Sequence, residues 1–263
     1  MKILKQISIV SLLLFILSIM SVSAYADMPS KPVMVNAQEK YIRTAYINEQ
    51  EFVLLRDLAN ALNGTPRQFN ITYYNEYNSI NIAESESYNY EYVEEIKDTT
   101  IHPGNFIFYK DWNPITLEHY VISGRIFVKL EEFANIFSLI IDYDTSSEIQ
   151  HIVSSKEIKY CGTEKVTAYY VPDGSANYNW ALEGGAYDYK GNLLEPGISA
   201  AGDKRNFKYG EYIYVEGFGV RKVTDCGSAI KGWRIDLCLT GQQYRNNWKD
   251  NPKCKIYKLS DLN

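Results

Sequence analysis

The sequence predicts a chain of two parts: an N-terminal α+β half over residues 31–153 and an all-β C-terminal half over residues 154–263. Two observations predict this division. A repeat with a constant offset of 75 residues occupies the first half, and short β-prone runs separated by Gly- and Asn-rich turns fill the second. A chain of 263 residues is also long enough for two domains.

Residues 1–26 have the features of a secretory signal peptide. Lys2 and Lys5 precede an apolar run over residues 7–22, and Ala24-Tyr25-Ala26 gives a small-x-small cleavage pattern. The alternative is a membrane anchor, but the apolar run is shorter than the about 20 residues of a spanning helix. We therefore expect a secreted protein that has no membrane contact after cleavage.

The charge of the chain excludes one class of partner. The net charge is −5, and removal of the two lysines of the signal segment leaves 25 basic against 32 acidic residues. Nucleic-acid binding requires a basic face, so no nucleic-acid partner is expected. A glycan would have to be held by shape, hydrogen bonds and aromatic stacking. The 23 tyrosines are numerous enough to provide stacking surfaces for sugars.

The N-terminal half contains the same pattern twice. Residues 52–62 match residues 127–137, and six apolar positions coincide. The spacing i, i+3, i+4, i+7 predicts an amphipathic helix in each copy. Each copy has a turn before it, at Asn48-Glu49 or Ser123-Gly124, and strand-like runs after it, over residues 71–82 and 140–153.

This unit of hairpin, helix and strands resembles the stalk domain named after the N-terminal region of copper amine oxidases. Such domains recur beside cell-wall hydrolases. The resemblance implies a spacer, or a module that contacts the wall or a partner protein. Neither copy offers a metal cluster or a nucleophile-base pair, so we expect neither copper nor catalysis here.

The C-terminal half is predicted to form a small barrel. Its β-prone runs cover residues 166–171, 212–216, 219–224, 233–237 and 255–259, with Gly- and Asn-containing breaks between them. Several short strands with regular breaks are typical of barrels. Residues 154–157 form the expected linker to the first half.

The four cysteines all lie in the C-terminal half. An even number in one region of an exported protein predicts two disulfides, for which three pairings are open. A metal site is the alternative, but no C-x-x-C spacing exists and the three histidines lie outside the cysteine region.

Two aspartates of this half, Asp225 and Asp236, are the candidate catalytic residues. Alternation over residues 233–237 places Asp236 on the opposite face from its apolar neighbours, where an acid is costly unless it is used or paired. Asp225 ends a strand, and Gly227 lets the chain turn closely past it. Two acids in one small barrel can split in pKa, so that one holds a proton near neutral pH.

The run Asp225-x-Gly-x-Ala-Ile-Lys-Gly-x-x-Ile-Asp236, with Asp203 before it, resembles the three-aspartate (3D) domain of exported bacterial wall proteins. Its core is similar to that of membrane-bound lytic transglycosylase A. The resemblance covers residues 166–259 and implies a double-psi β-barrel. Departures are Cys226 after the first acid, Cys238 beyond the second, and Lys-Arg-Asn-Phe-Lys after Asp203.

The resemblance also implies an activity, namely cleavage of the bond between N-acetylmuramic acid and N-acetylglucosamine in peptidoglycan, without cofactor or metal. Asp236 would protonate the leaving oxygen and then deprotonate the C6 hydroxyl, which closes a 1,6-anhydro ring, while Asp225 tunes Asp236. The residues expected to line the substrate cleft are Thr167, Tyr169, Asp203, Gly227 and Lys231.

Given this cleft, we expect a disulfide between Cys226 and Cys238, because each neighbours one of its acids. Cys161 and Cys254 would then join the first and last strands of the domain. Two other functions stay open: a glycoside hydrolase with Asp225 as base and Asp236 as acid, and a non-catalytic barrel that binds wall glycan.

Overall fold

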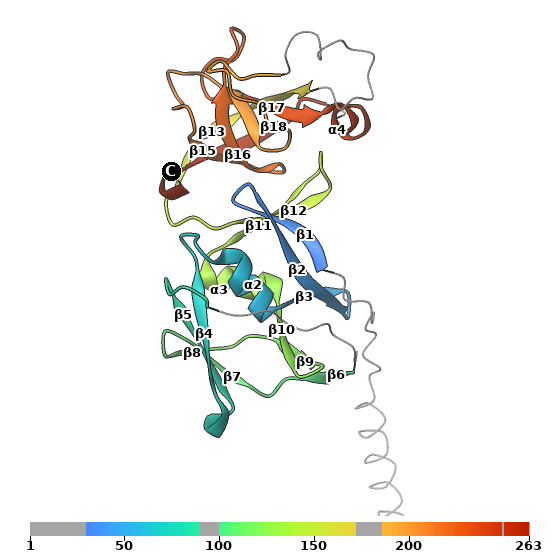
Figure 1. Cartoon of the computed structure of the whole chain (residues 1–263), viewed down its shortest axis with the longest axis vertical. Helices are drawn as coiled ribbons and strands as arrows, with labels where there is room; N and C mark the ends of the chain where they lie inside the picture. The colour runs from blue at the N-terminus through green and yellow to red at the C-terminus, as the bar shows by residue number, and fades with distance from the viewer. Residues whose placement is uncertain (1–29, 90–99, 172–185, 249, 263) are drawn as a thin grey trace, which may run out of the picture.

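The computed structural model describes residues 30–89, 100–171, 186–248 and 250–262 (Figure 1). The predicted signal peptide lies outside these residues. Within the described ranges, no helix is both long and apolar enough to cross a membrane.

The N-terminal half consists of strands and two short α-helices. In chain order its elements are β1 (Ser30–Val35), β2 (Gln38–Ile47), β3 (Gln50–Leu54), α2 (Leu55–Leu62), β4 (Phe69–Tyr74), the 3-10 helix η1 (Asn75–Tyr77), β5 (Ser79–Glu84), β6 (Ile101–Pro103), β7 (Ile107–Lys110), β8 (Asn113–Ile115), β9 (His119–Ile122), β10 (Arg125–Lys129), α3 (Leu130–Phe137), β11 (Ile140–Asp144) and β12 (Ile149–Val153).

These elements form two sheets with both helices between them (Figure 1). One sheet has the order β11-β12-β1-β2-β3-β10-β9-β6, and the other has the order β4-β5-β7-β8. One apolar core contains Val33 from the large sheet, Leu58 and Phe133 from the two helices, and Ile80 and Phe108 from the small sheet. The helices therefore bury their apolar faces against both sheets, as their spacing predicts.

Both predicted helices are present, and each follows a hairpin with the same kind of turn. Asn48 and Glu49 have positive φ, as do Ser123 and Gly124. Such two-residue turns match the right-handed twist of the strands that they join. Between the two hairpins, β3 and β10 pair antiparallel with Val53 opposite Val128, two residues that are 75 positions apart.

The C-terminal half is a closed six-stranded barrel of order β13-β17-β14-β16-β15-β18. Its elements are β13 (Ile158–Val171), β14 (Ser199–Gly202), β15 (Tyr212–Val215), β16 (Gly219–Asp225), β17 (Ile235–Thr240), the helix α4 (Gly241–Asn247), β18 (Lys253–Leu259) and the 3-10 helix η3 (Ser260–Leu262). The prediction of an all-β C-terminal half is confirmed, apart from the short helix α4.

Sequence patterns explain most of the barrel but did not predict the strand β14 or the helices α4 and η3. Val166, Ile235, Leu237 and Leu239 fill its core, as alternation along β13 and β17 predicts. β14 escaped prediction because its sequence, Ser-Ala-Ala-Gly, lacks β-branched and aromatic residues. The helix α4 did carry a signal: Thr240 and Gln243 form a capping box, with the backbone N–H of Gln243 donating to Oγ1 of Thr240 over 3.1 Å.

The segment that joins the two halves is not a flexible tether. Ser154 and Ser155, within the predicted linker, are both fully buried. The Ser154 N–H donates to Oδ1 of Asn36 over 2.8 Å, and the Ser155 hydroxyl donates to the Asp261 carboxylate. The linker therefore binds residues from both parts of the chain.

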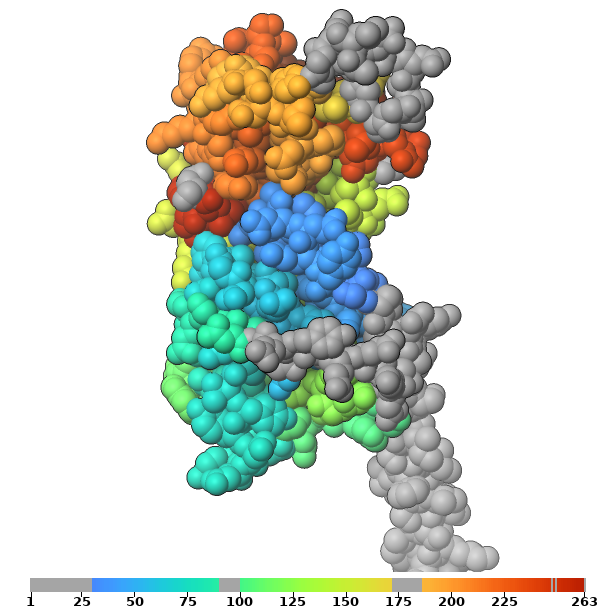
Figure 2. All heavy atoms as spheres, viewed as in Figure 1, coloured from blue at the N-terminus to red at the C-terminus, as the bar shows by residue number. Residues whose placement is uncertain are grey.

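An apolar cluster also lies where the two halves meet. Ala37, in the turn between β1 and β2, and Val153 of β12 pack with Tyr214, Val220 and Leu259 of the barrel. Figure 2 shows the residues of β1 and β2, in blue, directly against the orange and red residues of the barrel. The two halves therefore share a small core of their own.

The hairpin β11–β12 fastens the N-terminal half to the barrel as well (Figure 1). Arg221 of β16 is fully buried and forms an ion pair with the buried Asp144 of β11. His151 of β12 lies beside this pair, and its ring occupies the space that a Cβ on Gly219 would need. Because a buried ion pair that loses one partner is strongly destabilising, this contact holds the two halves together.

Candidate functional site

The parallel pairing of β13 with β17 brings four of the predicted site residues together in two pairs. Thr167 lies opposite Asp236, and Tyr169 lies opposite Cys238. Ile235 and Leu237, on either side of Asp236, point into the barrel core. Asp236 therefore stands on the outer face of the barrel wall, where it is half-buried.

The surroundings of Asp236 favour a carboxylic acid that keeps its proton. Burial is the largest influence and raises the pKa of Asp236, and the charge of Asp225 raises it further. Two contacts oppose this. The Thr167 hydroxyl donates a hydrogen bond of 2.6 Å to Oδ1 of Asp236, and the charge of Arg234 also lowers its pKa. The balance leaves the pKa of Asp236 above the usual value for an aspartate.

Asp225 reaches the same face through a β-bulge. Val223 pairs with Ala200, yet Asp225 rather than Thr224 pairs with Ala201, so β16 has one extra residue at this point. Val223 faces the barrel core. In a regular strand, Asp225 would share the face of Val223, which lies two residues before it. The bulge therefore turns Asp225 to the outer face, a re-aiming that is common near functional sites.

Ala201 lies between the two acids. It pairs with Asp225 on one side and with Asp236 on the other. Two strand spacings, about 10 Å, therefore separate the backbones that carry the carboxylates. The residue between them, Ala201, has only a methyl side chain, which is almost fully buried.

Tyr169 connects Asp225 to the buried Cys238. Its hydroxyl donates to Oδ2 of Asp225 over 3.4 Å and also hydrogen-bonds the Cys238 thiol. Burial raises the pKa of Tyr169 well above its usual value, with smaller contributions from Cys238 and Asp225. Tyr169 is therefore a neutral hydrogen-bond donor that orients Asp225.

Asp203 is placed differently from the acid pair. Its buried carboxylate accepts hydrogen bonds from the Arg205 guanidinium over 2.6 Å and from the Gly232 N–H over 2.9 Å. The bonds from Arg205 are the main reason why the pKa of Asp203 lies far below the usual range. Asp203 thus stays ionised and fixes the loop that leads into β17. Its predicted contact with substrate stays a prediction.

The remaining two predicted residues lie on the loop between the acids. Lys231 is exposed, at the outer edge of this loop. Gly227 accepts a hydrogen bond of 3.1 Å from the Ile230 N–H, and a Cβ at Gly227 would approach Cγ1 of Ile230 to 3.1 Å. A side chain at this position would have to displace Ile230 by a few tenths of an ångström, so the turn favours a glycine.

The structure contradicts both predicted disulfides, since all four cysteines, which lie in described ranges, are free thiols. In the pairing of β13 with β18, Cys254 lies opposite Glu164, three residues along from Cys161. Three residues of a strand span about 10 Å. A disulfide allows at most about 7 Å between Cα atoms.

Cys226 and Cys238 are also too far apart. Cys226 follows Asp225 beyond Ala201, whereas Cys238 lies on the other side of Ala201, two strands away. The position of each of these cysteines near an aspartate of the pair does not bring their two sulfur atoms within bonding distance. Burial instead raises the pKa of the Cys238 thiol to about 12 and that of Cys254 to about 11, so both are packed, neutral thiols.

The sequence analysis did not predict the buried cluster of Asp144, His151 and Arg221 at the junction of the two halves. Burial lowers the pKa of His151 to about 4, with the charge of Arg221 acting in the same direction against the opposing charge of Asp144.

Among the described residues, no group of three or more His, Cys, Asp or Glu side chains is placed to bind a metal.

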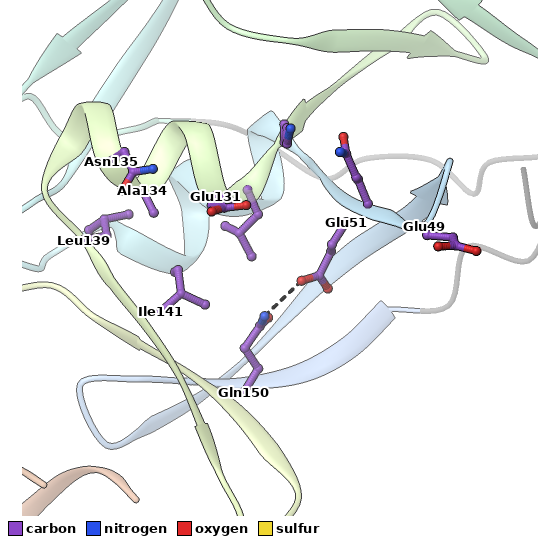
Figure 3. Close-up of a pocket in the computed structure, with 11 residues that line it drawn as sticks. Glu49, Glu51, Glu131, Ala134, Asn135, Leu139, Ile141 and Gln150 are labelled. Carbon is purple, nitrogen blue, oxygen red and sulfur yellow. Dashed lines mark hydrogen bonds between the residues drawn. The ribbon is translucent and has the colours of Figure 1, made fainter. Parts of the chain in front are cut away.

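The N-terminal half contains a cavity of its own, with a volume of about 410 Å³. Figure 3 shows Glu131 at the start of α3 beside Ala134, Leu139 and Ile141, with Glu51 across from it. Nε2 of Gln150 donates to Oε2 of Glu51 over 2.9 Å. This cavity is acidic and separate from the acid pair of the barrel.

The comparisons with known proteins assign no family. The chain matches no family model, and no curated protein is significantly similar to it.

Proposed function

We propose that this protein is a peptidoglycan lytic transglycosylase that uses Asp236 as its single acid and base. The observation that carries the proposal is the position of Asp236: half-buried on the barrel wall, with a raised pKa and a firm hydrogen bond from Thr167. Cleavage of a glycosidic bond needs a protonated acid beside the leaving oxygen. A carboxyl group whose pKa is raised supplies it.

The second half of the reaction needs no further group. Once Asp236 has given its proton to the leaving oxygen, its carboxylate accepts the proton of the C6 hydroxyl as that oxygen attacks C1. The proton returns to Asp236 and the anhydro ring closes, so neither water nor a second catalytic carboxylate takes part. Asp225, held by Tyr169, raises the pKa of Asp236 for the first step.

The finer fold assignments belong to this proposal. The barrel combines parallel pairs, β13 with β17 and β14 with β16, with antiparallel ones, which supports a double-psi arrangement. The two hairpin-helix segments and the central pairing of Val53 with Val128 support a stalk repeat. The extracellular, wall-associated location and the peptidoglycan partner follow from the same proposal.

One observation favours a second function, a glycoside hydrolase. In inverting hydrolases the two carboxyl groups stand about 6.5–9.5 Å apart, so that a water fits between acid and base. Asp225 and Asp236 flank the small Ala201 in a way that suits such a spacing. A non-catalytic glycan-binding barrel is the third candidate, and it would use the same face without cleavage.

The products distinguish the three functions. Purified protein is incubated with peptidoglycan, and the soluble fragments are identified by mass spectrometry. A transglycosylase releases fragments with 1,6-anhydro-muramic ends. A hydrolase adds one water instead, so its fragments have reducing ends and are heavier by about 18 Da. Binding to insoluble wall without released fragments would identify a binding module.

A further inference from the structure

The small sheet of the N-terminal half has an outer face, on the side away from α2 and α3 (Figure 1). Phe69, Ile82 and Phe108 point from this sheet into the apolar core. Alternation therefore places on the outer face the side chains of Asn70, Thr72, Tyr74, Ser79, Asn81, Ala83, Ile107 and Tyr109. None of these eight is charged, although 22% of the residues of the chain are.

Trp112 extends across this outer face from the turn between β7 and β8. Its backbone N–H donates to Oδ1 of Asn81 over 2.9 Å, and the centre of its ring lies 5.3 Å from that of the Tyr74 ring. Because β5 lies between β7 and β4 in the sheet, the indole crosses β5 to reach Tyr74. Asn81 beneath it is only 4% exposed, whereas Trp112 itself is 64% exposed. Most of the indole surface is therefore open to a ligand.

The turn holds Trp112 in a fixed position at a conformational cost. Asp111 and Trp112 have φ values of 48° and 65°, which Asn and Gly adopt readily and a bulky side chain does not. Oδ1 of Asp111 accepts a hydrogen bond of 2.9 Å from the Glu84 N–H, and the Asp111 N–H donates to the Ile82 carbonyl over 3.0 Å. Strained backbone that its surroundings hold in place is typical of functional sites.

The outer face also has hydrogen-bonding groups that are available to a ligand. Within the described part of the chain, the hydroxyls of Thr72, Tyr74 and Tyr109 and the indole N–H of Trp112 make no hydrogen bond. Such groups beside exposed rings are complementary to a sugar. Its C–H groups pack on the negative face of an aromatic ring, and its hydroxyls and amides hydrogen-bond at the edge of the ring.

The lack of charge favours a sugar over the other ligands of exposed aromatic rings. Helices and segments that bind the surface of a membrane combine Trp and Tyr with Lys and Arg. A charged peptide would need side chains of opposite charge on the protein. The outer face provides neither, since none of its eight side chains nor Trp112 is charged. A neutral glycan requires no charged partner.

We propose that the outer face, with Trp112 and Tyr74 as its aromatic surfaces, binds the uncharged backbone of a β-1,4-linked N-acetylhexosamine chain. The choice of this polymer rests on the proposed function, since the barrel would cleave the same glycan. The outer face lies in the other half of the chain from Asp225 and Asp236. It would hold a glycan strand while the barrel acts on it.

Chitohexaose, a neutral chain of N-acetylglucosamine, tests the proposal without cleavage. It is titrated by calorimetry into the full-length mature protein with Asp236→Asn, and binding is expected. The additional change Trp112→Gly should weaken binding about fivefold or more, the effect of one aromatic stacking contact. Trp112→Phe should retain most of the affinity, because it keeps a ring at this position. The change in tryptophan emission on binding should nevertheless decrease in Trp112→Phe, which locates the sugar at residue 112.

The glycine variant separates binding from folding. Glycine adopts positive φ without strain, and Asp-Gly is a favoured pair in this kind of turn, so the melting temperature should not fall. The matched control is Tyr41→Ala, which removes an exposed ring from β2 of the large sheet and should leave the affinity within about twofold. Undiminished affinity in Trp112→Gly, or an equal loss in Tyr41→Ala, overturns the proposal.

Sedimentation identifies two other occupants of the outer face. A wild-type dimer that Trp112→Gly dissociates would assign the face to a second copy of the chain. Binding to phosphatidylcholine vesicles that depends on Trp112, without binding to chitohexaose, would assign it to lipid. Either result overturns the proposal.

Product analysis separates this proposal from the proposed function. Glycan binding that depends on Trp112, in a wild-type protein that releases no anhydro products from peptidoglycan, would refute the transglycosylase alone. Release of anhydro products without glycan binding that depends on Trp112 would refute the role of the outer face alone.

Discussion

Asp225 and Asp236 stand on different strands of the barrel, and both pair with the same residue, Ala201. This shared neighbour places the two acids on one face, although they are eleven residues apart in the sequence. The β16 bulge contributes one extra residue, Thr224, directly before Asp225. Its geometry yields the first prediction.

Deletion of Thr224 should remove the bulge but keep Asp225 on the outer face, because Asp225 would then directly follow the core-facing Val223 and still lie opposite Ala201. We expect the deletion to retain most of the activity and of the stability, because Asp225 keeps both its face and its neighbour Ala201. Urea unfolding and product assays measure both effects. The matched comparison is Thr224→Ser, which keeps the bulge; loss of activity in the deletion alone would contradict the placement of Asp225 by strand alternation.

Replacement of Thr167 by Val should raise the pKa of Asp236 further. The hydroxyl of Thr167 donates to the Asp236 carboxylate over 2.6 Å and so favours the ionised form. The acid must be protonated for bond cleavage. The alkaline limb of the pH profile of kcat/KM should therefore move to higher pH.

Thr163, on the same strand but exposed, provides the control for this profile. Thr163→Val should leave the alkaline limb in place. A downward shift in Thr167→Val would mean that the hydrogen bond serves the protonated acid, contrary to our assignment.

The junction of the two halves should weaken in mild acid because of His151. Burial and Arg221 lower its pKa in the folded protein to about 4 against the opposing effect of Asp144, whereas an unfolded histidine titrates near 6.5. The unfolded state therefore takes up the proton first as the pH falls. The stability contributed by neutral His151 is complete above about pH 6.5 and declines toward pH 4, by about 1.4 kcal/mol per pH unit at most.

Melting temperatures between pH 7.5 and 4.5 test this prediction. His151→Gln should show a flatter decline than the wild type, since the glutamine cannot be protonated. The exposed His102 serves as the control, and His102→Gln should follow the wild-type curve. An unchanged slope in His151→Gln would show that other groups cause the decline.

The four cysteines should behave as thiols in the native protein. Alkylation in denaturant without reductant should modify all four, and reductant should leave the melting temperature unchanged. In the folded state Cys226, which is partly exposed, should react before the buried Cys238, whose pKa is raised to about 12. Mass spectrometry of alkylated peptides gives both results. A peptide pair joined by a disulfide before any oxidant is added would contradict the structure.

Residue patterns in the sequence predict the local elements well, but not how they meet. Period-3.6 spacing located both helices, and alternation placed Asp236 opposite the core residues Ile235 and Leu237. No sequence pattern predicts the bulge at Thr224, because the bulge arises from the register of β16 against β14. The place of Asp225 beside Ala201 could therefore be learned only from the fold.

The tertiary contacts between residues far apart in the sequence could not be predicted from the sequence either. The ion pair of Arg221 with Asp144 joins residues that are 77 positions apart, and neither stands in a pattern that suggests burial. The disulfide prediction failed for the same reason: it used the count and compartment of the cysteines, whereas bonding depends on strand register. Sequence patterns indicate which face a residue occupies, and only tertiary pairing determines distances.

The central claim is that Asp236 supplies both proton transfers, and product analysis of Asp236→Asn tests it most directly. The asparagine keeps the shape of the side chain but cannot donate and then accept a proton. We predict that 1,6-anhydro products fall by about 10²-fold or more relative to the wild type, with glycan binding and folding retained, and that Asp225→Asn has a milder effect. Wild-type amounts of anhydro products from Asp236→Asn would contradict the account.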